Sequence, residues 1–144
     1  MQTVHWLGAG LSSLPGIRKI AQSGQRLILW NRTLAKAEQA VASLGIKVPT
    51  KQLDWLALEA EVNPGDLVIS MLPATLHLQV AELCIGLKAH FVSSSYVSPE
   101  MQALHDKAKS LNLCFVNEVG LDPGLDHLLA HALIAEYQAS DKFD

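Results

Sequence analysis

The sequence predicts an α/β domain built on a doubly wound parallel sheet, with about six strands and helices on both faces. Short apolar runs alternate along the chain with segments of helical periodicity, which is the pattern of consecutive βαβ units. A glycine-rich turn directly follows the first apolar run. The 144 residues, 49% hydrophobic and 17% charged, fit a single compact domain without long tails.

Turn residues divide the first half of the chain into three strands and three helices. The apolar run at 3–7 leads to a helix in which Pro15 suits the first turn, because its missing N–H is not needed there. Gly24 and Gly45 end the first two helices, and Thr33 is positioned to cap the second. The strands are expected near 3–7, 26–30 and 46–48, and the helices near 14–23, 34–44 and 53–60.

The second half continues the alternation. The turn Asn63-Pro64-Gly65-Asp66 introduces the fourth strand, and the turn Asp122-Pro123-Gly124 precedes a last helix that Asp126 can cap. The strands are expected near 67–71, 90–93 and 113–116, and the helices near 75–86, 98–111 and 126–138.

The turn after the first strand has the features of a phosphate-binding loop in a Rossmann-type domain. Gly8 permits the tight reversal, and Gly10 leaves no Cβ between the backbone and a pyrophosphate. The next helix, for which Ser12 or Ser13 can serve as N-cap, offers N–H groups and its positive dipole end to an anion. Ser13 stands where the motif usually has Gly or Ala, so Gly16 is the candidate for close packing on the strand. The alternative is a strand-to-helix turn without a ligand.

The segment Asn31-Arg32-Thr33 follows the second strand, where an NAD-specific domain usually carries Asp or Glu. A guanidinium can form paired hydrogen bonds to a 2′-phosphate and stack on adenine, and a neutral Asn31 does not repel the phosphate. The segment therefore predicts NADP(H) in preference to NAD(H). The alternative is that Arg32 is a solvated charge and Thr33 only a helix cap.

Composition argues against several other classes of protein. A net charge of −3 without a Lys/Arg cluster disfavours a nucleic-acid partner. The sequence has no apolar stretch near the roughly 20 residues that span a bilayer and no secretory signal pattern, so we expect no membrane association and a cytoplasmic location. Cys84 and Cys114 are expected to be reduced core residues. His127 and His131 share a helical face, but no third ligand is apparent, so no metal site is predicted.

Unusual residues also follow the later strands. Met71-Leu72-Pro73 follows the fourth strand, Ser93 to Tyr96 the fifth, and Asn117-Glu118 the sixth. In an open parallel sheet the carboxyl ends of the strands form the ligand-binding edge. We therefore expect these residues to converge with the first two turns on one site.

The segment 117–130, N-E-V-G-L-D-P-G-L-D-H-L-L-A, carries two carboxylates, Asp122 and Asp126, that from the residues alone could be purely structural. The segment resembles the signature of the saccharopine dehydrogenase (saccharopine reductase) family. Residues 95–101, S-Y-V-S-P-E-M, and the Gly8-Ala9-Gly10 turn match the same family pattern. The resemblance covers essentially the whole chain, as the N-terminal nucleotide-binding domain of that family.

This resemblance implies an NADP(H)-dependent oxidoreductase that acts at a C–N bond of a small amino-acid-type substrate. An imine would be reduced to a secondary amine such as saccharopine, in lysine metabolism, although polyamine-forming relatives share the motifs. By position, Tyr96, Asp122 and Asp126 would face the reacting carbon, although Tyr96 could instead be a half-buried packing residue. The cofactor would be contacted by the pyrophosphate residues Gly8, Gly10, Leu11 and Ser12, by Arg32 at the 2′-phosphate, and by Leu72 and Pro73 at the ribose and nicotinamide.

The family's substrate domain is not recognisable within residues 1–144. We therefore expect a fragment of a longer enzyme, inactive by itself, in preference to a reduced nucleotide-binding protein. We also expect apolar surface around Leu129, Leu133 and Ile134, and self-association into a homodimer. Two alternatives are a non-catalytic nucleotide sensor and an interaction module without ligand. The segment from Asn31 to Ala37 also resembles the NADP loop of shikimate-dehydrogenase-like proteins.

Overall fold

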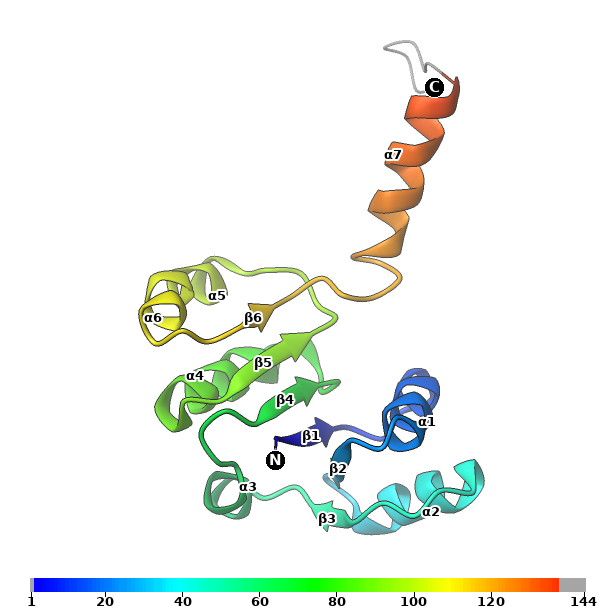
Figure 1. Ribbon diagram of the computed structural model, residues 1–144, viewed down its shortest axis with the longest axis vertical. Helices are drawn as coiled ribbons and strands as arrows, with labels where there is room; N and C mark the ends of the chain where they lie inside the picture. The colour runs from blue at the N-terminus through cyan, green and yellow to red at the C-terminus, as the bar shows by residue number, and fades with distance from the viewer. Residues whose placement is uncertain (1, 138–144) are drawn as a thin grey trace.

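A six-stranded parallel sheet forms the centre of the computed structural model, which describes residues 2–137 (Figure 1). The strand order is β3-β2-β1-β4-β5-β6, so the chain moves outward from β1 on one side and then returns to β4 on the other. This order confirms the predicted doubly wound fold and places a topological switch point between β1 and β4. The strands are β1 (Thr3–Leu7), β2 (Arg26–Asn31), β3 (Thr50–Gln52), β4 (Leu67–Ser70), β5 (His90–Ser93) and β6 (Phe115–Val116).

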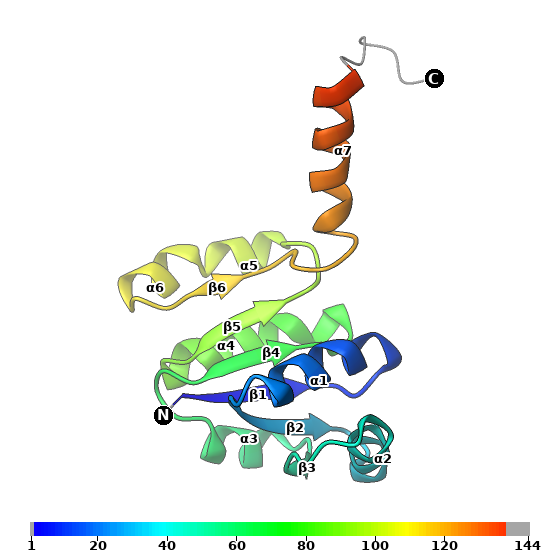
Figure 2. The same ribbon diagram turned by 45° about the vertical axis from the view of Figure 1, so that its right-hand side comes forward.

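Helices cover both faces of the sheet, and each face has its own apolar core (Figure 2). Trp6 and Leu29 face one layer, formed by α1 and α2. Leu7 and Trp30 face the other, formed by α3, α4 and α5. Adjacent residues of a strand thus enter opposite cores, as the period of two requires. The helices are α1 (Leu14–Gln22), α2 (Leu34–Leu44), α3 (Trp55–Glu61), α4 (His77–Leu87), α5 (Pro99–Ala103), α6 (His105–Ser110) and α7 (Leu125–Tyr137), with short 3₁₀ turns η1 (Leu11–Ser13) and η2 (Ala74–Leu76).

Gly16 allows α1 to lie directly on β1. A Cβ at Gly16 would overlap the six-membered ring of Trp6, which is buried between the helix and the sheet. This contact confirms that Gly16, three residues after the usual motif position, provides the close helix packing.

The third strand lies at Thr50–Gln52, so its prediction at 46–48 was wrong. Leu29 N donates to Pro49 O at 2.9 Å, and Leu29 is paired with Thr50 in the β2–β3 ladder. Ile46 and Val48 pack against the core beneath α1 and α2 without joining that ladder. The apolar run therefore indicated burial, whereas the pairing at the sheet edge is made by more polar residues.

Two other predictions also need correction. Cys114 is exposed and precedes β6, which begins at Phe115, so it is not a core residue. Cys84 is buried as expected, and its burial raises the pKa of the thiol to about 12. The predicted helix 98–111 is two helices, α5 and α6, which meet at Leu104.

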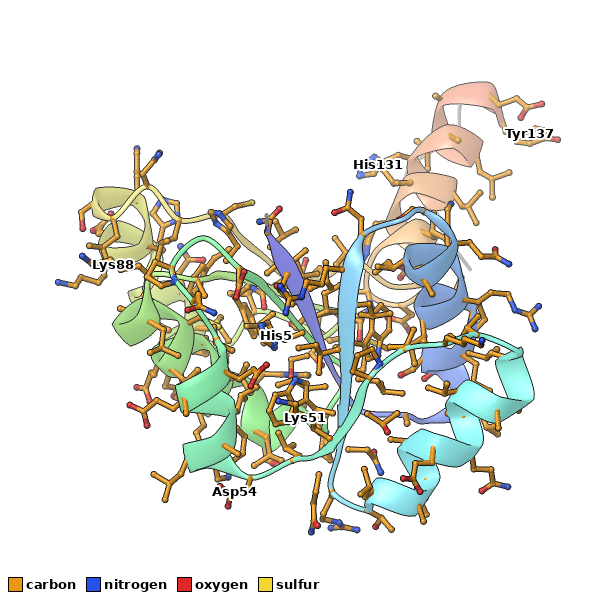
Figure 3. All side chains as sticks on the ribbon, turned by 60° about the horizontal axis from the view of Figure 1, so that its bottom comes forward. His5, Lys51, Asp54, Lys88, His131 and Tyr137 are labelled. Atoms are coloured by element: carbon orange, nitrogen blue, oxygen red, sulfur yellow. The ribbon has the colours of Figure 1, made fainter. Side chains whose placement is uncertain are left out.

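Helix α7 extends away from the sheet (Figures 1 and 2). None of its residues is buried, and the side chains of His131 and Tyr137 point away from the domain (Figure 3). Leu129, Leu133 and Ile134 are 60%, 56% and 43% exposed, which confirms the expected apolar surface. The last residue of the predicted helix, 138, lies outside the described residues. Among residues 2–137, no helix has the length and apolar character needed to cross a membrane.

Candidate functional site: a two-part cavity at the carboxyl edge of the sheet

The Gly8–Gly10 turn is shaped for a close approach from outside. Gly8 has a φ of +105°, and a Cβ on it would stand 2.7 Å from Met71 O, so only glycine fits. A Cβ on Gly10 would have no heavy atom within 4 Å, which means that its backbone faces open space. Ser13 Oγ is the one buried side-chain polar atom of the described residues without a hydrogen-bond partner. An open glycine backbone and an unsatisfied hydroxyl at the start of a helix fit a bound pyrophosphate.

Three predicted helix caps do not form through their side chains. Ser13 already has helical backbone angles, φ −80° and ψ −27°, because the η1 turn precedes α1, and its hydroxyl caps nothing. Thr33 precedes α2 with an extended backbone but makes no side-chain cap bond. Asp126 lies inside the first turn of α7, where its Oδ1 accepts from Gly124 N at 2.8 Å. Asp126 therefore fastens the preceding turn instead of capping the helix.

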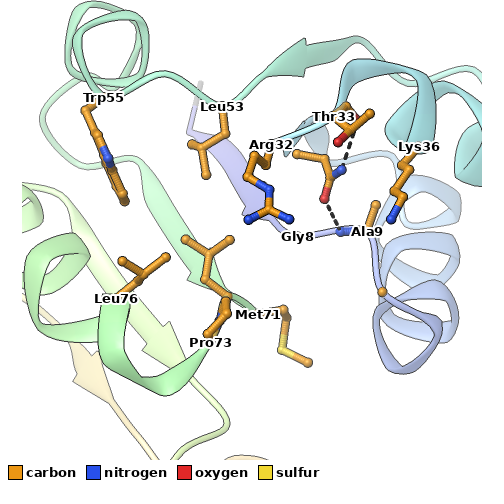
Figure 4. Close-up of a pocket in the computed structure, with 13 residues that line it drawn as sticks. Gly8, Ala9, Arg32, Thr33, Lys36, Leu53, Trp55, Met71, Pro73 and Leu76 are labelled. Carbon is orange, nitrogen blue, oxygen red and sulfur yellow. Dashed lines mark hydrogen bonds between the residues drawn. The ribbon is translucent and has the colours of Figure 1, made fainter.

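A cavity of about 370 Å³ lies between the glycine turn, the end of β2 and the end of β4 (Figure 4). Arg32, Thr33 and Lys36 border it on one side, and Leu53, Trp55 and Leu76 supply apolar wall. Leu72 and Pro73 also line this cavity, as does the glycine turn from Gly8 to Gly10.

Asn31 connects the two loops that frame the first cavity. Its Oδ1 accepts from Ala9 N at 3.2 Å, and its Nδ2 donates to Thr33 O at 2.9 Å (Figure 4). Both polar atoms of the amide are thus occupied, and the adjacent Arg32 borders the cavity. Arg32 and Lys36 are the positively charged residues that line this cavity.

Sequence reasoning missed Lys36 and Trp55. Lys36 lies in the first turn of α2, a helix that was predicted correctly, so its place near the end of β2 could have been inferred from the predicted helix start. Trp55 starts the helix after β3, and the misplaced third strand concealed that it follows a strand at the same edge.

A second cavity of about 520 Å³ lies beside the first, and Met71 borders both. Ser12 and Ser93 contribute to its lining, as do Gly120 and Asp122 from the turn before α7. Leu11 borders neither cavity and is 89% exposed. The residues predicted to converge after β1, β2, β4 and β5 therefore do line these two cavities, whereas Asn117 and Glu118, after β6, border neither.

Tyr96 and Asp122 are joined directly. The Tyr96 hydroxyl donates to Asp122 Oδ1 at 2.5 Å, and Asp122 borders the second cavity. This hydrogen bond, with the charges of Asp122, Asp126 and Glu118, raises the pKa of Tyr96. The phenol therefore keeps its proton at neutral pH. Tyr96 is 62% exposed, so the alternative of a half-buried packing residue is wrong.

Asp126 lies next to this pair but borders neither cavity. Desolvation acts to raise the pKa of Asp126, but hydrogen bonds from the backbone of Gly124 and His127 outweigh it, and the pKa is lowered. The carboxylate is thus held in its ionised form at the base of α7.

The chain is similar to known proteins over most of its length. The family model described as the saccharopine dehydrogenase NADP binding domain matches residues 4–116. The saccharopine dehydrogenase (NADP(+), L-glutamate-forming) of Pyricularia oryzae is 39% identical over 141 residues, which cover 96% of this chain and 31% of that protein. The α-aminoadipic semialdehyde synthase of Arabidopsis thaliana is 49% identical over 73 residues, which cover 51% of this chain and 7% of that protein.

A solved structure agrees with these sequence matches. The apo histidine-tagged saccharopine dehydrogenase (L-Glu forming) from Saccharomyces cerevisiae superposes with a TM-score of 0.81 at 34% identity, covering 94% of this chain and 31% of that one. This chain therefore spans less than a third of the length of its fungal relatives. NADP(H) is the cofactor of the matched domain, in agreement with the prediction from Asn31 and Arg32. The chain belongs to the saccharopine dehydrogenase NADP-binding domain family.

Proposed function

We propose that NADP(H) lies along the carboxyl edge of the sheet, with its adenosine half in the first cavity and its nicotinamide directed toward the second. The observation that carries this proposal is the pair of cavities that share Met71 at the end of β4. The Gly8–Gly10 turn borders the first cavity and Ser12 the second, so a dinucleotide can pass over the turn with its pyrophosphate at the start of α1.

The polar side of the first cavity supports selectivity for the phosphorylated cofactor. Arg32 and Lys36 would pair with the 2′-phosphate, while the uncharged Asn31 holds the loop with its amide. Trp55 would offer its ring to the adenine from the apolar side. Leu72 and Pro73 follow Met71 and border only the first of the two cavities, so in this pose they would contact the cofactor between its adenosine and its nicotinamide ribose.

The glycine turn would bind the pyrophosphate through its backbone. Gly10, Leu11 and Ser12 would contribute main-chain N–H groups, because η1 leads into α1 with no side-chain cap at its start. Gly8, whose N–H donates to Trp30 O at 2.8 Å, would instead permit the tight turn that brings these groups to the phosphates. The unpartnered Ser13 hydroxyl adds a donor beside these groups.

For the whole protein we propose oxidoreduction at a C–N bond of a small amino-acid-type substrate, as the names of the fungal relatives suggest. NADP(H), when bound, supplies or accepts the hydride. Asp122 would accept or return a proton at the second cavity, and the protonated Tyr96 would orient its carboxylate. Asp126 would fix the turn that carries Asp122.

The lining of the second cavity also indicates where the substrate carboxylates would be bound. It contains no Lys or Arg among the described residues, whereas a substrate with carboxylates needs cationic groups. We therefore propose that residues 1–144 act as the nucleotide-binding domain and that the carboxylate clamp lies outside this cavity. We also propose a cytoplasmic protein that forms a homodimer.

Fluorescence titration with 2′,5′-ADP and NADPH tests the cofactor site. The compound 2′,5′-ADP carries the 2′-phosphate and adenosine but no nicotinamide, so it should occupy only the first cavity. We expect 2′,5′-ADP to bind and NADPH to displace it. Failure of both compounds to bind would contradict the proposal and favour the interaction module.

A further inference from the structure

His77, the first residue of α4, connects two strand ends that lie side by side in the sheet. It is buried, at 4% exposed, and its Nδ1 lies 2.8 Å from Ser70 Oγ while its Nε2 lies 2.8 Å from Ser95 Oγ. Ser70 is the last residue of β4, next to Met71. Ser95 directly precedes Tyr96 in the loop after β5. The ring therefore spans from the end of β4 to the loop that carries the candidate catalytic tyrosine.

The ring is held as a neutral, fully bonded group. Burial lowers the pKa of His77, so the imidazole is uncharged at neutral pH. A neutral imidazole has one donor and one acceptor nitrogen, and a serine hydroxyl can complement either. With both nitrogens occupied inside the protein, the ring has one favoured orientation.

Glu118, which follows the neighbouring strand β6, holds the same loop. Its N–H donates to Ser95 O at 3.1 Å, and its Oε1 accepts from Val97 N at 3.1 Å. Glu118 has a φ of +62°, a backbone conformation that is uncommon for a residue with a side chain. The backbone on both sides of Tyr96 is therefore held by Glu118, and the Ser95 side chain by His77; neither Glu118 nor His77 borders the first or the second cavity.

We propose that His77 is a positioning residue that, through Ser95, places Tyr96 so that its hydroxyl meets Asp122 at the second cavity. The inference rests on the proposed function of Tyr96 and Asp122. His77 borders neither of the two cavities, so its effect on the reaction is transmitted through the loop.

The test measures the pKa of Tyr96 by its ultraviolet absorbance. The chain has two tyrosines, so Tyr137→Phe leaves the Tyr96 phenol as the only one that titrates. His77→Asn retains polar atoms near the position of Nδ1 but does not reach Ser95, whereas His77→Gln extends to the position of Nε2. Circular dichroism at each pH shows that the variants stay folded.

The expected result is a fall in the Tyr96 pKa toward its ordinary value of about 10 in His77→Asn and in Ser95→Ala. His77→Gln should keep the pKa raised, since the bond to Ser95 is restored. The double variant His77→Asn/Ser95→Ala should shift the pKa no further than either single variant, because both remove the same hydrogen bond.

His5→Asn is the matched control, because His5 is equally buried but bonds to Asp66 and Trp30 and has no contact with this loop. It should lower stability without moving the Tyr96 pKa. An unchanged Tyr96 pKa in His77→Asn and Ser95→Ala, or an equal fall in His5→Asn, would overturn the inference. NADPH binding, measured on the same proteins, distinguishes a failure of the proposed function from a failure of this inference. A parent protein that does not bind NADPH would contradict the proposed function, whereas the Tyr96 titration tests only the positioning role of His77.

Discussion

Trp55 and Arg32 border the same cavity but would contact different parts of the cofactor. Trp55→Ala should weaken NADPH and NADH by the same amount, about 1–3 kcal/mol, because both carry the adenine that stacks on the ring. Calorimetric titration with each cofactor measures the loss. Leu56→Ala is the control, since Leu56 is 77% exposed and borders neither of the two cavities. A loss confined to NADPH would remove Trp55 from the adenine site.

His5 gives the sheet a pH dependence. Trp30 Nε1 donates to His5 Nδ1 at 3.2 Å, so the proton of the neutral ring is on Nε2, which lies 3.2 Å from Asp66 Oδ2 (Figure 3 shows His5 among the strands). Desolvation lowers the pKa of His5, and Asp66 only partly offsets it. His77 is shifted in the same direction by burial.

The folded state therefore binds these protons less readily than the unfolded state. Stability should be fully present above the unfolded histidine pKa of about 6.5 and should fall as the pH drops below it. Urea unfolding at pH 8 and pH 5.5 measures how far the midpoint falls on acidification. His5→Asn should make this fall smaller. A midpoint that rises on acidification would show that the histidines gain protons on folding.

At the scale of the elements, the packing of α1 on β1 depends on Gly16. Gly16→Ala should cost about 1–3 kcal/mol of unfolding free energy, because the new Cβ overlaps the buried Trp6 ring. Gly86→Ala is the matched helical control: no atom lies within 4 Å of its Cβ position, so alanine should be neutral or stabilise α4 by up to about 1 kcal/mol. Chemical denaturation measures both. Equal effects at the two sites would contradict this packing role.

The elements also show where sequence reasoning succeeds. Helix α2 was predicted with its observed bounds, because Gly45 ends it in the left-handed conformation, with φ +63°, that glycine adopts readily. The third strand was misplaced because an apolar run reports burial, whereas strand pairing at an edge depends on neighbours distant in sequence.

The residues of the candidate site could be predicted in part from the sequence, but their hydrogen bonds could not. The residues at strand ends were found because topology brings the carboxyl ends of parallel strands together. The hydrogen bonds of His77, Glu118 and Asn31 join residues on different elements, and no local pattern predicts such partners. The wrong cap roles of Ser13 and Asp126 have a local cause. The η1 turn gives Ser13 helical backbone angles, and α7 begins at Leu125, so Asp126 lies inside the helix and accepts from Gly124 N.

At the scale of the whole molecule, α7 presents apolar side chains on a helix that leaves the sheet. We expect the chain to self-associate through Leu129, Leu133 and Ile134, because a helix so exposed gains by burying these residues. Light scattering over a range of concentrations measures the mass, and Leu129→Gln with Leu133→Gln should shift it toward the monomer. A parent protein that stays monomeric at high concentration would contradict the proposed homodimer.

The central claim is that the first cavity recognises the 2′-phosphate of NADP(H), and calorimetric titration of NADPH and NADH tests it most directly. The parent should bind NADPH more tightly. Arg32→Ala should cost about 1.5–3 kcal/mol for NADPH and leave NADH nearly unchanged, because only NADPH carries the phosphate. Arg18→Ala, an exposed arginine on α1 that borders neither of the two cavities, should change neither affinity. Equal affinities for the two cofactors in the parent, or an equal loss of both in Arg32→Ala, would contradict the account.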